Sequence, residues 1–163
     1  NTGNSIVDKS KISSALELIN KAKTRKNIFL PKDVICSSSI NEEPSGHAFD
    51  ITKMPVDQMG LDIGPKTIES FSKHISESET IVWNGPMGVF ESNFFQHGTR
   101  AIAEHIASCT KDGLVSIIGG GDTAFALRKF NLENKMTHLS TGGGASIELL
   151  SGKNLPAIFA LEV

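Results

Sequence analysis

The sequence predicts an α/β fold, in which helices cover both faces of a parallel sheet. Short apolar runs of strand length alternate with stretches that repeat apolar residues every three or four positions. Several of these runs end in loops rich in glycine, and 163 residues suit one domain. Strands that alternate with helices are joined by right-handed crossovers, which make the strands parallel.

Five segments carry the apolar spacing of one helical face and are expected to be helices. In the first, Ile12, Leu16 and Ile19 fall on one side, with lysines elsewhere. The second begins at Gly64-Pro65, because proline suits the first turn of a helix. In chain order the expected helices cover 10–25, a stretch from 64, 94–109, 123–130 and 145–150.

Three short apolar runs predict strands at 28–30, 80–83 and 115–118, and a weaker strand is expected at 137–140. Pro31 should end the first, because proline cannot donate to a sheet ladder. Between the first and second strands lies an exposed excursion rich in serine. Short pairing strands are expected there at 49–52 and 56–59.

Composition excludes several classes of protein. The net charge of -2 gives no general attraction to polyanions, which argues against a nucleic-acid partner. No apolar run approaches the ~20 residues of a membrane span. Two cysteines are too few for a disulfide scaffold, so we expect a cytoplasmic protein. The chain starts at Asn1 without a methionine, close to a helical pattern, as a chain cut from a longer one would.

Glycine is the informative residue. Six of the 15 glycines form two triplets, 119–121 and 142–144, each directly after an expected strand. A third loop, 84–91, follows the strand before them. Because ligands of parallel sheets bind beyond the carboxyl ends of the strands, all three loops should share one edge. Glycine-rich helix starts present N–H groups to anions, so this edge predicts a phosphate site.

Asp122 does not suit an anion site unless a cation intervenes. A Mg²⁺ ion held by one carboxylate and phosphate oxygens would resolve the conflict, which makes a Mg-nucleotide the natural ligand. The simpler alternative is that Asp122 caps a helix. Glu91 could accept hydrogen bonds from sugar hydroxyls, although taken alone it is better explained as a charge at a helix start. Trp83 is expected in the core.

Five motifs together resemble phosphoglycerate kinase, from about Gly3 to Leu161. They are Met59–Pro65, Trp83–Glu91, Gly119–Thr123, Ser140–Ser146 and Gly152–Pro156. The resemblance implies a two-domain, monomeric glycolytic kinase with a Rossmann-like nucleotide domain. Such an enzyme transfers a phosphoryl group between 1,3-bisphosphoglycerate and ADP, with Mg²⁺, giving ATP and 3-phosphoglycerate. Residues 1–163 would form most of its C-terminal, nucleotide-binding domain, without the N-terminal substrate domain.

The resemblance also implies roles for residues at matching positions. Ile6, Gly60 and Leu61 would line the adenine pocket, and Glu91 would hold the ribose hydroxyls. Asp122 would meet the metal, with Thr123 beside the phosphates. Further nucleotide contacts would come from Asn84, Pro86, Gly88 and Val89. The backbone N–H groups around the transferring phosphoryl would come from Gly120, Gly121, Gly142, Gly143 and Gly144, of which Gly120, Gly121, Gly143 and Gly144 would act in catalysis.

Departures from the family pattern limit what we expect of these residues alone. The family's Gly-Gly-Ala-Lys segment, a second glycine-rich segment and the basic cluster of the substrate domain are absent from the sequence. We therefore expect a sheet that lacks its first strands and a chain with little or no turnover. Two alternatives remain: a module that only binds nucleotide, and a nicotinamide-dependent oxidoreductase, which the missing G-x-G-x-x-G disfavours.

Overall fold

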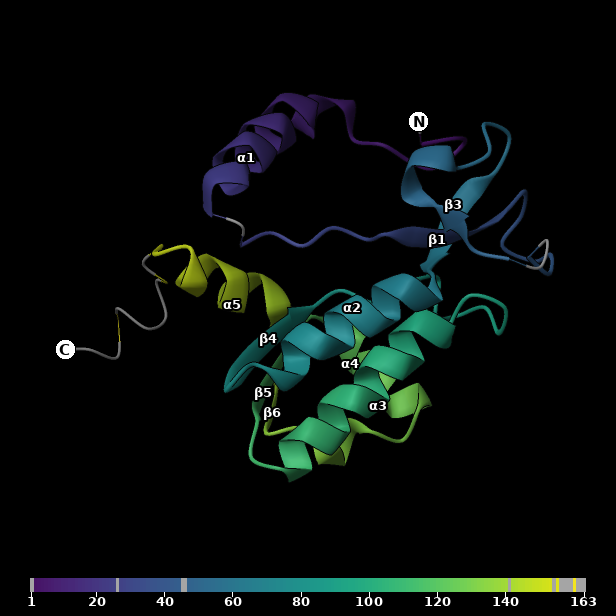
Figure 1. The fold of residues 1–163 in the computed structure, drawn as a ribbon. Helices are drawn as coiled ribbons and strands as arrows, with labels where there is room; N and C mark the ends of the chain where they lie inside the picture. The colour runs from purple at the N-terminus through teal and green to yellow at the C-terminus, as the bar shows by residue number, and fades with distance from the viewer. Residues whose placement is uncertain are drawn as a thin grey trace.

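The computed structural model describes residues 2–25, 27–44, 47–140, 142–153, 155 and 160. It confirms an α/β fold in which helices flank a parallel sheet (Figure 1). The helices are α1 (Ile12–Arg25), α2 (Pro65–Ser76), α3 (His97–Lys111), α4 (Gly121–Lys129) and α5 (Gly143–Leu150). The strands are β1 (Asp33–Ser37), β2 (Phe49–Asp50), β3 (Met59–Ile63), β4 (Thr80–Asn84), β5 (Val115–Gly119) and β6 (His138–Ser140). No helix within these ranges is long and apolar enough to cross a membrane.

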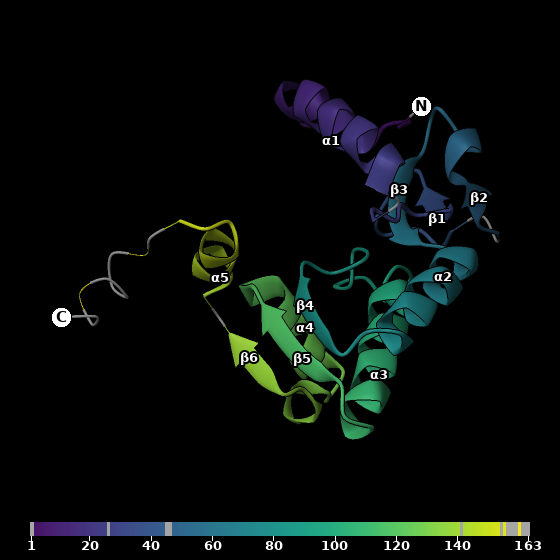
Figure 2. The same ribbon diagram turned by 60° about the vertical axis from the view of Figure 1, so that its left-hand side comes forward.

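The parallel sheet has the order β4-β5-β6 (Figure 2). Its register places Asn84 opposite Gly119, and Gly119 opposite Ser140. The three strands therefore end level with one another. The loops that follow them leave the sheet from neighbouring positions, as the sequence predicts.

The main hydrophobic core lies between one face of this sheet and helices α2, α3 and α4. Trp83 and Ile118 of the strands belong to this core together with Ile106 of α3 and Leu127 of α4. Side chains alternate between the two faces of a strand, so Val82 lies on the opposite face, where it is 45% exposed.

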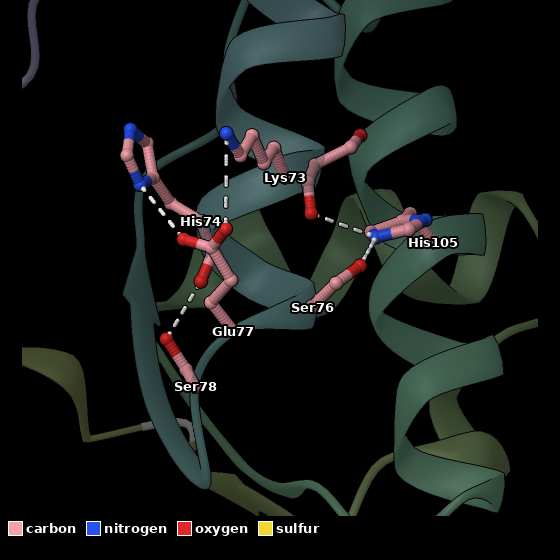
Figure 3. Close-up of polar contacts among 7 residues, drawn as sticks. Lys73, His74, Ser76, Glu77, Ser78 and His105 are labelled. Carbon is pink, nitrogen blue, oxygen red and sulfur yellow. Dashed lines mark hydrogen bonds and ion pairs between the residues drawn. The ribbon is translucent and has the colours of Figure 1, made fainter.

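Helices α2 and α3 also share a polar contact near their carboxyl ends (Figure 3). The Nε2 atom of His105 lies 2.8 Å from Ser76 Oγ and 2.9 Å from the carbonyl oxygen of Ser72. On the outer side of α2, Lys73 and His74 both face Glu77, at 3.9 and 3.8 Å. The His105 contacts join the two helices, whereas the Glu77 contacts lie within α2 and at its end.

A second, antiparallel sheet has the order β2-β1-β3. It is tied to α2 through Asp33 of β1, whose carboxylate accepts hydrogen bonds from the backbone N–H groups of Lys66 and Thr67, at 3.0 and 2.8 Å. In return, Thr67 Oγ1 accepts hydrogen bonds from the N–H groups of Lys32 and Asp33. The first turn of α2 is thus capped from a distant strand, because its own cap residue, Gly64, has no side chain to do so.

The expected strand at 28–30 is wrong. These residues carry no sheet pairing, and Ile28, Phe29 and Leu30 are 46%, 52% and 58% exposed. An apolar run becomes a strand only where a neighbour completes its hydrogen bonds, and this run pairs with no strand among the described residues. The strand forms further along instead, as β1, and pairs antiparallel with β2 and β3.

Two other expected elements have different bounds in the structure. The strand expected at 56–59 starts only at Met59 and runs to Ile63, and it pairs with β1 rather than with β2. Helix α3 starts at His97 rather than at Phe94, because the preceding residues form a turn in which the Phe94 N–H donates to Ser92 Oγ. The remaining helices and strands lie within a few residues of their expected bounds.

Candidate functional site

The three glycine-containing loops leave the sheet side by side, and the first two of them contact each other. Gly120 adopts a φ of +98°, which side-chain-bearing residues rarely adopt. A Cβ atom there would lie 3.3 Å from Asn84 Oδ1 and 3.5 Å from Thr123 Oγ1. Glycine at 120 therefore lets the loop turn into α4 close to the end of β4.

Helix α4 opens directly onto this edge. Gly121 and Asp122 in its first turn are exposed, and a Cβ atom on Gly121 would meet nothing within 4 Å. A Cβ atom on Gly144, in the first turn of α5, would also meet nothing within 4 Å. The first N–H groups of a helix have no partner within it, so both starts can receive an anion. Thr141, part of the third loop, lies outside the described residues.

Loop 84–91 is held by buried hydroxyl groups. The Gly85 N–H donates to Thr123 Oγ1 at 2.8 Å, and the N–H groups of Met87 and Gly88 donate to Thr99 Oγ1 at 3.0 and 3.2 Å. The indole N–H of Trp83 donates to the Gly85 carbonyl at 2.7 Å. The loop thus has a defined path, even though residues 85–91 form no helix or strand.

A cavity of about 260 Å³ lies between this loop and strands β1 and β3. Five residues of the predicted nucleotide site line it: Gly60, Leu61, Pro86, Gly88 and Val89. The remaining lining residues are Pro31, Asp33, Val34, Ile51, Asp62, Ile63 and Met87. The wall is mixed apolar and polar, as small-molecule sites generally are. A larger hollow of about 560 Å³ lies at the far end of α3, away from the three loops.

Sequence reasoning missed Asp62, which is only 4% exposed and lines this cavity. Its Oδ2 accepts the Gly98 N–H at 2.7 Å and its Oδ1 accepts the Ile63 N–H at 2.9 Å. Burial raises the pKa of Asp62 to about 6, against the smaller lowering effect of these hydrogen bonds and of His97. The available signal was a carboxylate inside an apolar strand, between Leu61 and Ile63.

The position of the Asp62 carboxylate also explains why glycine is needed at positions 88 and 98. A Cβ atom on Gly88 or on Gly98 would lie 2.3 Å from Asp62 Oδ1. Both positions therefore need glycine if the carboxylate is to sit between loop 84–91 and the start of α3.

The other residues predicted for the site do not line this cavity, and they differ in how exposed they are. Ile6 is fully exposed and does not line the cavity, although its neighbour Ser5 accepts the Gly60 N–H at 2.9 Å. Glu91 is exposed, and Lys129 Nζ donates to its carbonyl oxygen at 3.3 Å. Thr123 is buried, with its hydroxyl facing Gly85. Trp83 lies in the core, as expected.

No group of three or more His, Cys, Asp or Glu side chains that could hold a metal ion occurs in the described part of the chain. Asp122 remains the single predicted metal contact. Its carboxylate is exposed, and within the described residues no Lys or Arg forms an ion pair with it. A site that takes one ligand from the protein and the rest from phosphate oxygens and water is typical of Mg²⁺.

Fold and loops together define an α/β protein with a Rossmann-like parallel sheet and glycine-rich loops at the carboxyl edge of its strands. A family model described as phosphoglycerate kinase matches residues 1–153. The chain belongs to the phosphoglycerate kinase family.

Relatives and solved structures agree with this assignment. The chain is 49% identical to phosphoglycerate kinase of Chlorobium phaeovibrioides over 162 residues, covering 99% of this chain and 41% of that protein. The structure of phosphoglycerate kinase from Coxiella burnetii superposes with a TM-score of 0.89 at 40% identity, covering 99% of this chain and 41% of that one. The structure of phosphoglycerate kinase from Pyrococcus horikoshii OT3 superposes with a TM-score of 0.74 at 28% identity, covering 99% of this chain and 40% of that one. The chain thus spans about 41% of the length of the curated relatives that it matches.

Proposed function

We propose that this chain is the nucleotide-binding part of a phosphoglycerate kinase. In the proposed reaction a phosphoryl group passes between 1,3-bisphosphoglycerate and ADP, giving ATP and 3-phosphoglycerate. The observation that carries the proposal is the level ending of β4, β5 and β6, which brings three glycine-containing loops to one edge beside a cavity.

The proposed roles come from the resemblance to the family, and they suit phosphoryl transfer, in which catalysis consists mainly of positioning and charge stabilisation. The N–H groups of Gly120, Gly121, Gly142, Gly143 and Gly144 would surround the transferring phosphoryl group. Asp122 would hold Mg²⁺, which supplies charge neutralisation between the phosphates. The phosphates would lie over the start of α4, whose dipole favours negative charge.

The base would occupy the cavity of about 260 Å³ between loop 84–91 and β3. Its walls are Gly60 and Leu61 on one side and Pro86, Gly88 and Val89 on the other. Glu91 would accept the ribose hydroxyls, and Asn84 and Thr123 would border the phosphates. Ile6, as an exposed residue of the N-terminal segment, would close on the base only after movement of that segment.

We assign residues 1–163 to most of the C-terminal domain and expect a cytoplasmic monomer. The basic substrate cluster of the family is absent from these residues, so we propose that they bind nucleotide but transfer phosphoryl groups poorly or not at all. The N-terminal substrate domain would have to be added to reach normal turnover. This distinguishes the proposal from a module whose only role is to bind nucleotide.

Calorimetric titration with ADP, with and without Mg²⁺, tests the site. We expect Mg-ADP to bind and to protect the chain against unfolding, and NAD to do neither. Asp122→Ala should lose the effect of magnesium on ADP affinity, whereas Asp112→Ala, an exposed aspartate at the end of α3, should keep it. An unchanged magnesium effect in Asp122→Ala would refute the metal role, and protection by NAD would favour an oxidoreductase.

A coupled assay tests the remaining part of the proposal. The chain alone should show little or no production of ATP from 1,3-bisphosphoglycerate and ADP. Addition of a phosphoglycerate kinase N-terminal domain should raise single-turnover transfer. Normal turnover by the chain alone would contradict the assignment, and no transfer even with the added domain would favour a module that only binds nucleotide.

A further inference from the structure

The wall of the cavity formed by loop 84–91 depends on one hydroxyl group outside the predicted site. Thr99 Oγ1 accepts hydrogen bonds from two consecutive backbone N–H groups, of Met87 at 3.0 Å and of Gly88 at 3.2 Å. Thr99 is fully buried in the first turn of α3. Met87 and Gly88 both line the cavity, so the acceptor lies directly behind its wall.

Thr99 is itself fixed by the opposite wall. The preceding residue, Gly98, donates its N–H to the carboxylate of Asp62 at 2.7 Å, and Asp62 lines the cavity from β3. On the next residue of the loop, the Val89 N–H donates to the Leu61 carbonyl at 2.8 Å. The start of α3 is thus hydrogen-bonded to both walls of the cavity. Gly98 bonds to Asp62 of β3, and Thr99 bonds to loop 84–91.

A shape-matched residue without the hydroxyl would leave two N–H groups in a partly buried place without this acceptor. Buried donors that lose their partner are costly, and a loop can lower that cost by moving toward water. Such a movement would displace Met87 and Gly88 and change the shape of the cavity.

We propose that Thr99 is a positioning residue for nucleotide binding: its hydroxyl holds loop 84–91 in the conformation that accepts the base. The inference rests on the proposed function, since it assigns the cavity to a nucleotide. Thr99 would not touch the nucleotide and acts only through the loop.

Trp83 makes the loop position visible, because it is the single tryptophan of the sequence and its indole N–H donates to Gly85 within the loop. The variants to compare are Thr99→Val, which keeps the shape without the hydroxyl, and Thr99→Ser, which keeps the hydroxyl. Thr110→Val is the matched control, because Thr110 lies at the other end of the same helix, where its hydroxyl contacts the Ile106 carbonyl and Ser116 Oγ of β5.

We expect Thr99→Val to shift the Trp83 emission of the ligand-free chain and to weaken Mg-ADP binding about tenfold or more. Thr99→Ser should restore both properties to within about threefold of the original affinity. Thr110→Val should leave emission and affinity unchanged, even where urea unfolding shows that it loses stability. If Thr99→Val does not fold, Thr99→Cys replaces it, because a thiol is a weaker acceptor.

Two results would overturn the inference: unchanged Trp83 emission in Thr99→Val, or an equal loss of affinity in Thr110→Val. Failure of the original chain to bind Mg-ADP would refute the proposed function instead. In that case the emission of the ligand-free variants still decides whether Thr99 positions the loop.

Discussion

The buried carboxyl of Asp62 makes a quantitative prediction about pH and stability. Burial raises the pKa of Asp62 from the ordinary 3.8 to about 6, so the folded chain holds this proton more tightly than the unfolded chain does. The resulting contribution to stability is complete below about pH 3.8 and is lost as the pH rises through 6. The difference between the two pKa values corresponds to about 3 kcal/mol.

Asp62→Asn removes this titration while keeping the size of the side chain. The amide also changes the hydrogen bond to the Gly98 N–H, which adds an offset independent of pH. The free energy of unfolding of the variant, relative to the original chain, should therefore rise by about 2 kcal/mol between pH 4 and pH 7. The prediction concerns how the difference in free energy of unfolding changes with pH, and not its value at any one pH.

Urea unfolding followed by Trp83 fluorescence at several pH values measures this difference, because the other titrating groups are common to both chains. Asp112→Asn provides the baseline for removing a carboxylate that is exposed to water. A difference between Asp62→Asn and the original chain that stays constant from pH 4 to pH 7, or falls, would refute the reasoning.

Four further substitutions test packing and backbone conformation. Gly88→Ala places a Cβ atom 2.3 Å from Asp62 Oδ1 and should destabilise the chain by about 1–3 kcal/mol in urea unfolding. Gly120→Ala forces a side chain to adopt a φ of +98° and should cost about 1–3 kcal/mol in the same measurement. Leu127→Ala empties a fully buried position and should cost about 2–5 kcal/mol. Leu16→Ala, at a position 56% exposed on α1, should change stability by no more than about 0.5 kcal/mol.

Gly121→Ala is the control for both glycine variants, because the added Cβ atom meets nothing within 4 Å. It should unfold at the same urea concentration as the original chain or slightly above it, because alanine favours the helix more than glycine does. Loss of stability there, as large as in Gly88→Ala, would show that the local contacts do not explain the effect. For the leucines, equal losses at positions 16 and 127 would contradict the burial that the structure assigns to them.

The parallel half of the fold was predictable because its signals are local. Strands β4 and β5 are short apolar runs, β6 is a weaker one, and each strand is followed by a loop with a recognisable motif. Because parallel strands end at one edge of a sheet, the sequence places Asn84, Gly119 and Ser140 close together. The register of the sheet confirms that arrangement.

The remainder was not predictable from local signals. Ile28–Leu30 has the composition of a strand, but pairing depends on a neighbour that a single run of sequence does not reveal. The need for glycine at 88 and 98 comes from the carboxylate of Asp62, which is 26 and 36 positions away in the chain. Thr99 shows no motif at all, and only its two hydrogen bonds identify it.

The cap of α2 has a consequence for the order in which the chain can fold. Its first-turn N–H groups are satisfied by Asp33, more than 30 positions earlier, so local sequence alone cannot complete the start of this helix. Contacts between distant positions form late, because the intervening chain must first be closed into a loop. We therefore expect α2 to gain full protection from amide hydrogen exchange only in the step that brings β1 into place. The start of α2 therefore depends on the second sheet. A substitution that destabilises β1 should first increase amide hydrogen exchange in the first turn of α2.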